Sequence, residues 1–132
     1  MSRDRDNYEH RLQQLKGKTF QRCLATNSVK FLFHHDNSYI WIDPPWRLTQ
    51  NGQELTSSDE CPIHTEANYK EQFKSWCDHF NPLNTSSLVD YRFDWDESLI
   101  LEAEEGYELE TEACKYDDPD SWYDHWYVEL KT

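Results

Sequence analysis

Glutamates recur at every second position in two neighbouring runs, residues 99–104 and 107–112, which meet at the turn Glu104-Glu105-Gly106. Successive side chains of a strand point to opposite sides of a sheet, so a hairpin of these runs would gather the glutamates on one face. Like charges so placed repel, and we expect them either to be fully solvated or to meet a cationic partner. The candidate partner-binding glutamates are Glu102, Glu104, Glu108, Glu110 and Glu112.

A second candidate contact region is the segment 117–127, which mixes carboxylates with large aromatic side chains. Trp and Tyr are typical anchors of protein interfaces, and acidic neighbours accelerate association with a basic partner. Trp126 alternates with Val128 and Leu130, so we expect it in the core. The candidate contact residues of the segment are Asp117, Asp118, Asp120, Trp122, Tyr123, Asp124 and Tyr127.

The charge of the whole chain favours the same kind of partner. The 132 residues suit a single domain and include 26 Asp and Glu against 13 Lys and Arg, a formal net charge of −13. Residues 90–129 contain fifteen acidic residues and only two basic ones, Arg92 and Lys115. This balance argues against direct binding to nucleic acid or to an anionic membrane, since both require positive charge. A basic protein is the expected partner.

Catalytic and metal-dependent functions find little support. On a helix, Cys77 and His79 would lie about 200° apart, so they face one metal together only if the helix has ended there. The acidic runs 94–97 and 117–120 lack the glycine and final glutamate of an EF-hand loop. No histidine falls in a catalytic motif, and three glycines do not form a phosphate-binding loop. We expect no enzyme activity, no metal and no cofactor. The zinc-type ligands considered are Cys61, His64, Cys77 and His79.

The elements that must position these residues follow from the hydrophobic pattern. A short helix is predicted over 7–16, and a longer amphipathic helix over 66–80, with Thr65 as N-cap and Asn81-Pro82 as its end. Strands are expected on both sides of the longer helix, with a tight turn at Gln50-Asn51-Gly52. The predicted strands are 20–25, 29–33, 39–42, 46–48, 53–56, 88–95, 99–103, 107–111 and 126–130.

The strands before and after the helix form two similar units. Ser28 and Tyr39 open the two strands of one hairpin as Ser98 and Tyr107 open those of the other, and each hairpin is followed by a strand that contains Trp. We therefore predict a duplicated strand-hairpin unit, 17–57 and 88–130, joined by the helix 66–80 in one domain, 1–132. The fold class would be α+β, with a mostly antiparallel sheet or open barrel.

Three runs carry a resemblance to a known type of protein: SVKFLFHHDNSYIWIDPPWRLTQNG, SLILEAEEGYELETEA and SWYDHWYVEL. They resemble short bacterial cytosolic proteins associated with polymorphic or contact-dependent toxin systems, which act as immunity proteins. The resemblance implies an inhibitor that occludes the active site of a cognate toxin. A basic, nuclease-type toxin would suit the acidic charge. The resemblance transfers no individual functional residue.

Two other functions fit the composition. The protein could mimic DNA and inhibit a nucleic-acid enzyme, as anti-restriction or anti-CRISPR proteins do, if its carboxylates follow the spacing of phosphates. It could also be an acidic structural or regulatory domain whose charge provides solubility. No stretch approaches the roughly 20 apolar residues that cross a bilayer, and the start has no apolar signal run, so we expect a cytoplasmic protein.

Overall fold

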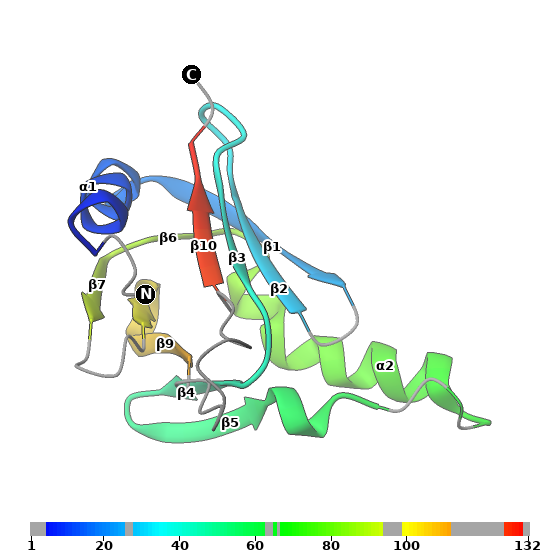
Figure 1. The fold of residues 1–132 in the computed structure, drawn as a ribbon. Coiled ribbons are helices and arrows are strands. Elements are labelled where there is room, and N and C mark those ends of the chain that lie inside the picture. Colours follow the sequence, from blue (N-terminus) through cyan, green and yellow to red (C-terminus); the bar gives the residue numbers. More distant parts are fainter. Residues whose placement is uncertain are drawn as a thin grey trace, which may run out of the picture.

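The computed structural model describes residues 5–25, 28–62, 65, 67–93, 99–111 and 126–130. In this part of the chain the fold is α+β, as predicted, with two antiparallel five-stranded sheets that stay open (Figure 1). Sheet A holds, in spatial order, β10 (Trp126–Glu129), β3 (Tyr39–Ile42), β2 (Ser28–Phe33), β1 (Thr19–Ala25) and β6 (Ser86–Ser87). Sheet B holds β5 (Gln53–Ser57), β4 (Trp46–Gln50), β9 (Tyr107–Thr111), β8 (Leu99–Glu102) and β7 (Asp90–Phe93). The described α-helices are α1 (Arg5–Leu15) and α2 (Tyr69–Cys77), and the 3₁₀ segments are η1 (Ser58–Glu60), η2 (Asp78–Leu83) and η3 (Glu104–Gly106).

Helix α2 is shorter than the prediction of 66–80. It begins at Tyr69 with Asn68 as N-cap, so Thr65 does not cap it. At its other end the α-helix stops at Cys77 and tightens into η2, which contains Pro82. A proline ring clashes with the carbonyl four residues earlier, here that of Asp78, so the α-helical pattern cannot continue through this turn. The proline therefore ends the α-helix earlier than the sequence pattern suggested.

The two predicted units have the same order of strands. In the first, β1, β2 and β3 form a meander in sheet A, and β4 then enters sheet B beside β9. In the second, β7, β8 and β9 form a meander in sheet B, and β10 then enters sheet A beside β3. Each entering strand opens with a buried tryptophan, Trp46 or Trp126. The units thus exchange their fourth strands, while their origin by duplication stays a prediction.

The hairpins of the two units differ by one residue in register. Tyr39 pairs with Leu32, whereas the pair at the equivalent place in the other unit is Glu108 with Glu102, not Tyr107 with Glu102. A slip of one residue turns every side chain of a strand to the opposite face. Tyr107 accordingly lies in the core while Tyr39 lies on the outer face of its sheet. Each tyrosine opens the second strand of its hairpin, as predicted, but the two side chains face opposite sides of their sheets.

The core lies between the sheets and is rich in aromatic rings. Trp46 stacks on Trp76 of α2, with ring centroids 6.0 Å apart, and meets Phe80 edge-on at 5.6 Å. The indole N–H of Trp76 donates to Thr56 Oγ1 over 2.8 Å, so the polar atom of this buried ring is satisfied. Helix α2 thus covers the aromatic end of the core, as its apolar stripe predicted. Trp126 is also fully buried, as predicted.

Helix α1 closes the side of the core where strands of both sheets approach each other (Figure 1). Its Leu12 and Leu15 are fully buried. The Arg11 guanidinium donates to the carbonyl of Val128 in edge strand β10, and the Tyr91 hydroxyl of β7 donates to Gln13 Oε1. The helix therefore occupies a backbone acceptor that an exposed edge strand would offer to another chain. No helix in the described part of the chain is long and apolar enough to span a membrane.

Candidate functional site

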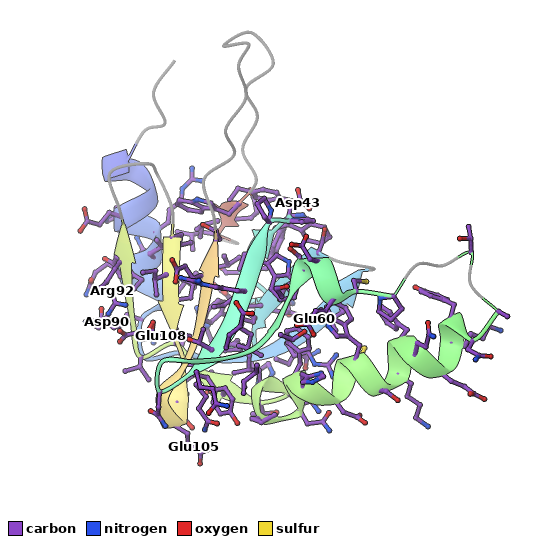
Figure 2. All side chains as sticks on the ribbon, turned by 90° about the horizontal axis from the view of Figure 1, so that it is seen from below. Asp43, Glu60, Asp90, Arg92, Glu105 and Glu108 are labelled. Atoms are coloured by element: carbon purple, nitrogen blue, oxygen red, sulfur yellow. The ribbon has the colours of Figure 1, made fainter. Side chains whose placement is uncertain are left out.

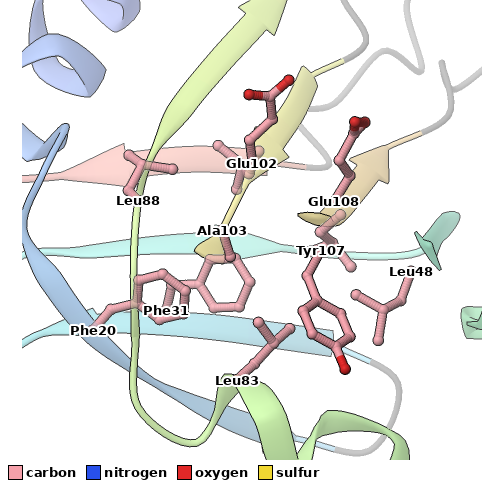
Figure 3. A pocket seen from close by; sticks show the side chains of 11 residues that line it. Phe20, Phe31, Leu48, Leu83, Leu88, Glu102, Ala103, Tyr107 and Glu108 are labelled. Carbon is pink, nitrogen blue, oxygen red and sulfur yellow. The ribbon is translucent and has the colours of Figure 1, made fainter. Parts of the chain in front are cut away.

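Strand β9 has the alternation expected from its sequence. Tyr107, Leu109 and Thr111 are buried, and Glu108 and Glu110 lie between them on the outer face of sheet B. Glu102 of β8 pairs directly with Glu108, so these two carboxylates share that face. Figure 3 shows both pointing away from the apolar side chains between the sheets. Those apolar side chains leave a gap too narrow for a water molecule, so a ligand of this region must bind outside the core.

Two arginines of neighbouring strands neutralise part of this acidic face. Arg92 of β7 pairs with Glu102 at 2.6 Å and with Glu108 at 3.2 Å. Arg47 of β4 pairs with Glu110 at 3.0 Å. From the sequence we expected these glutamates either to be fully solvated or to meet a cationic partner. In the structure three of them are instead paired with arginines of the same chain. Arg47 was missed because only the pairing of β4 with β9, strands far apart in the chain, places it beside Glu110.

Two further acidic residues lie at the turn of this hairpin and have no ion-pair partner in the described part of the chain. Glu104 and Glu105 are both exposed there, and with Glu102 and Glu108 they line a surface depression of about 400 Å³. Val89 lines it as well and is 48% exposed, the one exposed large apolar side chain among the described residues. The depression thus offers four carboxylates and an apolar wall. Its remaining lining residues are Asn51, Gly52, Ala103, Gly106 and Tyr107.

The shape of the depression depends on a close contact between two turns. The backbone N–H of Asn51, at the β4–β5 turn, donates to the carbonyl of Gly106 over 3.0 Å. Gly106 has φ of +79°, a conformation that favours glycine, and a Cβ atom there would lie 2.0 Å from Asn51 Oδ1, so the exposed Asn51 side chain would have to move. Glu105 itself has φ of 61°, a conformation uncommon for glutamate, and lies at the hairpin tip (Figure 2). The turn contact therefore fixes where the free carboxylates stand.

The other candidate contact residues are distributed differently. Glu112, Asp117, Asp118, Asp120, Trp122, Tyr123 and Asp124 lie outside the described residues. Tyr127 lies in β10, on the outer face of sheet A, where it meets Tyr39 edge-on at 6.0 Å. Burial, together with a hydrogen bond to Tyr39, raises the pKa of Tyr127. Tyr127 and the glutamate hairpin therefore belong to different sheets, and the role of both in binding a partner stays a prediction.

The cysteines and histidines form no metal cluster among the residues that the structure describes. Burial raises the pKa of the Cys61 and Cys77 thiols, which is the opposite of what an activated nucleophile or ligand needs. Although the α-helix does end at Cys77, the ring Nδ1 of His79 lies 3.0 Å from the Trp76 carbonyl oxygen. His64 lies outside the described residues.

No family model, curated protein or solved structure matches the chain. The acidic depression is therefore interpreted from its own geometry and charge. Carboxylates at an exposed turn, without a metal cluster or an activated nucleophile among the described residues, suit the recognition of a cationic side chain.

Proposed function

We propose that the protein is a non-catalytic inhibitor that binds a basic protein, with the acidic depression at the β8–β9 turn as its contact point. The observation that carries this proposal is the pairing pattern of the carboxylates. Arg92 neutralises part of the charge on Glu102 and Glu108, while Glu104 and Glu105 stand exposed beside them. A lysine or arginine of the partner would complete the pairing, and Val89 would contact its apolar stem.

The physical role of the net charge is to accelerate this encounter. A chain of net charge −13 attracts a basic surface over distances of about one Debye length, roughly 8 Å at physiological salt. Toxin domains that cut nucleic acid carry such basic surfaces because they hold phosphates, so an immunity protein for a nuclease-type toxin fits both the charge and the resemblance described above. In this proposal the bound protein would occlude the substrate-binding cleft of its toxin.

The arginines favour a protein partner of this kind over mimicry of DNA. A DNA mimic needs a continuous track of negative charge spaced like phosphates. On sheet B, Arg92 and Arg47 stand among Glu102, Glu108 and Glu110 and interrupt any such track.

The test requires, as the binding probe, a basic protein encoded by a gene adjacent to this one, and it uses charge reversal at the turn. Glu104→Lys/Glu105→Lys should slow association at low salt at least tenfold, because the encounter loses its attraction and gains a repulsion. The matched control is Glu71→Lys/Asp78→Lys, which makes the same change in net charge at two exposed positions of α2 and η2.

Two results would contradict the proposal. Equal slowing by the turn variant and by the control would show that only net charge matters and that the depression is not the contact point. Unchanged association of the turn variant would remove the depression from the mechanism altogether.

A further inference from the structure

A lysine on the outer face of sheet A is held by an aromatic ring. The Lys30 ammonium lies 4.7 Å from the centre of the Tyr39 ring, inside the distance of roughly 6 Å at which a cation and a ring face attract each other. Both side chains are partly exposed, and Lys30 has no ion-pair partner in the described part of the chain. In a chain with 26 acidic residues, this cation therefore rests on a ring and not on a carboxylate.

Neighbouring rings fix the surroundings of Tyr39. Tyr127 of β10 meets it edge-on, with ring centroids 6.0 Å apart. Trp41 lies on the same face of β3, where the strand pairing places it opposite both Lys30 and Tyr127. Its indole N–H donates to Asp43 Oδ1 over 2.8 Å. The rings are thus ordered before a ligand binds, so binding costs little side-chain entropy.

A carboxylate stands next to the ring that holds Lys30. Glu129 of β10 pairs directly with Tyr39, so the Cβ atoms of the two residues lie about 5 Å apart on one face. Glu129 is exposed and has no ion-pair partner among the described residues, which means that the Lys30 ammonium does not reach it. The lysine contacts the ring but not the carboxylate beside it.

The charge of this face favours a cationic occupant. Its described charged side chains are two anions, Asp43 and Glu129, and one cation, Lys30. Burial and the hydrogen bond with Tyr39 raise the pKa of Tyr127, and the two carboxylates add to that rise, so both act on the rings. A positively charged group complements this face. A second copy of the chain, with its net charge of −13, does not.

A guanidinium suits this arrangement better than an ammonium does. It is planar and stacks on ring faces, and its five N–H donors let it bond a carboxylate at the same time, whereas an ammonium is a compact, strongly hydrated point charge. We propose that the Tyr39 ring and the Glu129 carboxylate bind an arginine side chain of a partner protein, which displaces Lys30 from the ring. Lys30 is then an internal competitor for the site.

This surface differs from the acidic depression in what it recognises. The depression offers carboxylates, which pair with lysine or with arginine. A ring and a carboxylate together select arginine. Because the ring belongs to sheet A and the depression to sheet B, each can bind its cation without the other.

The test measures the binding of two short peptides to the full chain by NMR, from the ring signals of Tyr39 and Tyr127 at about 0.15 M NaCl. The probes are an acetylated hexapeptide amide with two arginines and its counterpart with two lysines, which carry equal charge. The arginine peptide should bind at least about threefold more tightly, because only a guanidinium contacts the ring and the carboxylate together. Tyr39→Leu should abolish this preference, whereas Tyr39→Phe should keep it, since it retains the ring.

Two charge changes test the displacement of Lys30. Lys30→Met should tighten binding of the arginine peptide at least about threefold, because the competing cation leaves the ring. The control Lys70→Met, at an exposed position of α2, makes the same change in net charge and should have a smaller effect. Glu129→Gln should weaken the arginine peptide several-fold and the lysine peptide less. Circular dichroism reports whether each variant is folded.

Three results would overturn the arginine site. Equal binding of the two peptides to the wild-type chain would show that only charge is recognised. A preference that survives Tyr39→Leu would place the arginine elsewhere. Equal effects of Lys30→Met and Lys70→Met would show that Lys30 does not compete for the ring. The ring signals report sheet A alone, and the turn variants report the acidic depression, so the two proposals fail separately.

Discussion

Arg92 carries the sharpest prediction about the fold, because it separates two carboxylates that face each other. In Arg92→Met the apolar stem is kept and the charge is lost. Glu102 and Glu108, whose Cβ atoms in such a pair lie about 5 Å apart, then stand unpaired on one face. Both ion pairs are largely exposed, with half of the Arg92 side chain accessible, so each is worth only about 0.2–1 kcal/mol.

The loss of both ion pairs and the repulsion between Glu102 and Glu108 together should lower the free energy of unfolding of Arg92→Met by about 1–2 kcal/mol at 0.1 M NaCl. At 1 M NaCl the Debye length falls to about 3 Å, so at least half of the loss should disappear. Urea denaturation at both salt concentrations measures this. Lys70→Met, an exposed lysine on α2 without an ion-pair partner in the described part of the chain, is the control and should change stability by less than about 0.3 kcal/mol.

A double-mutant cycle decides whether the cause is electrostatic. In the background Glu102→Gln/Glu108→Gln, Arg92→Met should lower the free energy of unfolding only slightly. Neither an ion pair with Arg92 nor a repulsion between carboxylates is left to be lost or uncovered in that background. A loss that is equal in this background, or equal at both salt concentrations, would refute the reasoning and assign the effect to packing of the arginine stem. The variant also removes the positive charge that pairs with two carboxylates of the depression, so it should bind a basic partner faster although it is less stable.

Two further predictions concern the turns. Gly106→Ala should lower the free energy of unfolding in urea denaturation by about 1–3 kcal/mol, because its positive φ strains alanine and the exposed Asn51 side chain must also move away. Gly17→Ala, where φ is also positive but nothing lies within 4 Å, should cost about 1 kcal/mol, and a larger loss there than at Gly106 would contradict the contact with Asn51. Hydrogen bonds from Ser38 lower the pKa of Asp36 below its usual 3.8, so ionised Asp36 stabilises the fold above about pH 4 and this stabilisation is lost as the pH falls through the lowered pKa. The free energy of unfolding of Asp36→Asn should therefore fall less steeply than that of the wild type below about pH 4. An unchanged slope in urea denaturation across this pH range would contradict the prediction.

What the sequence predicts well here is local. The alternation of Glu108 and Glu110 with buried neighbours, the burial of Trp126 and the stripe of α2 all follow from the period of one element. What it misses depends on pairs of elements. Arg47 meets Glu110 only because β4 enters sheet B, and Gly106 meets Asn51 only because two turns are brought together by that same pairing. The side of the molecule on which Tyr127 lies was missed for the same reason, since its strand joins the sheet of the other unit.

The exchange of the fourth strands affects how this chain can fold during its synthesis. Sheet A is incomplete until β10 joins β3, and sheet B is incomplete until β4 and β9 pair, so each sheet needs strands from both ends of the chain. During synthesis, the first meander leaves the ribosome with its β3 edge bare and its apolar face uncovered, and it stays so until the closing strand emerges. Contacts this distant in sequence form slowly, and an uncovered edge invites association with other chains. Because fifteen of the 26 acids lie between residues 90 and 129, the half-made chain also lacks most of the negative charge that would keep it apart from other chains while its edge is uncovered.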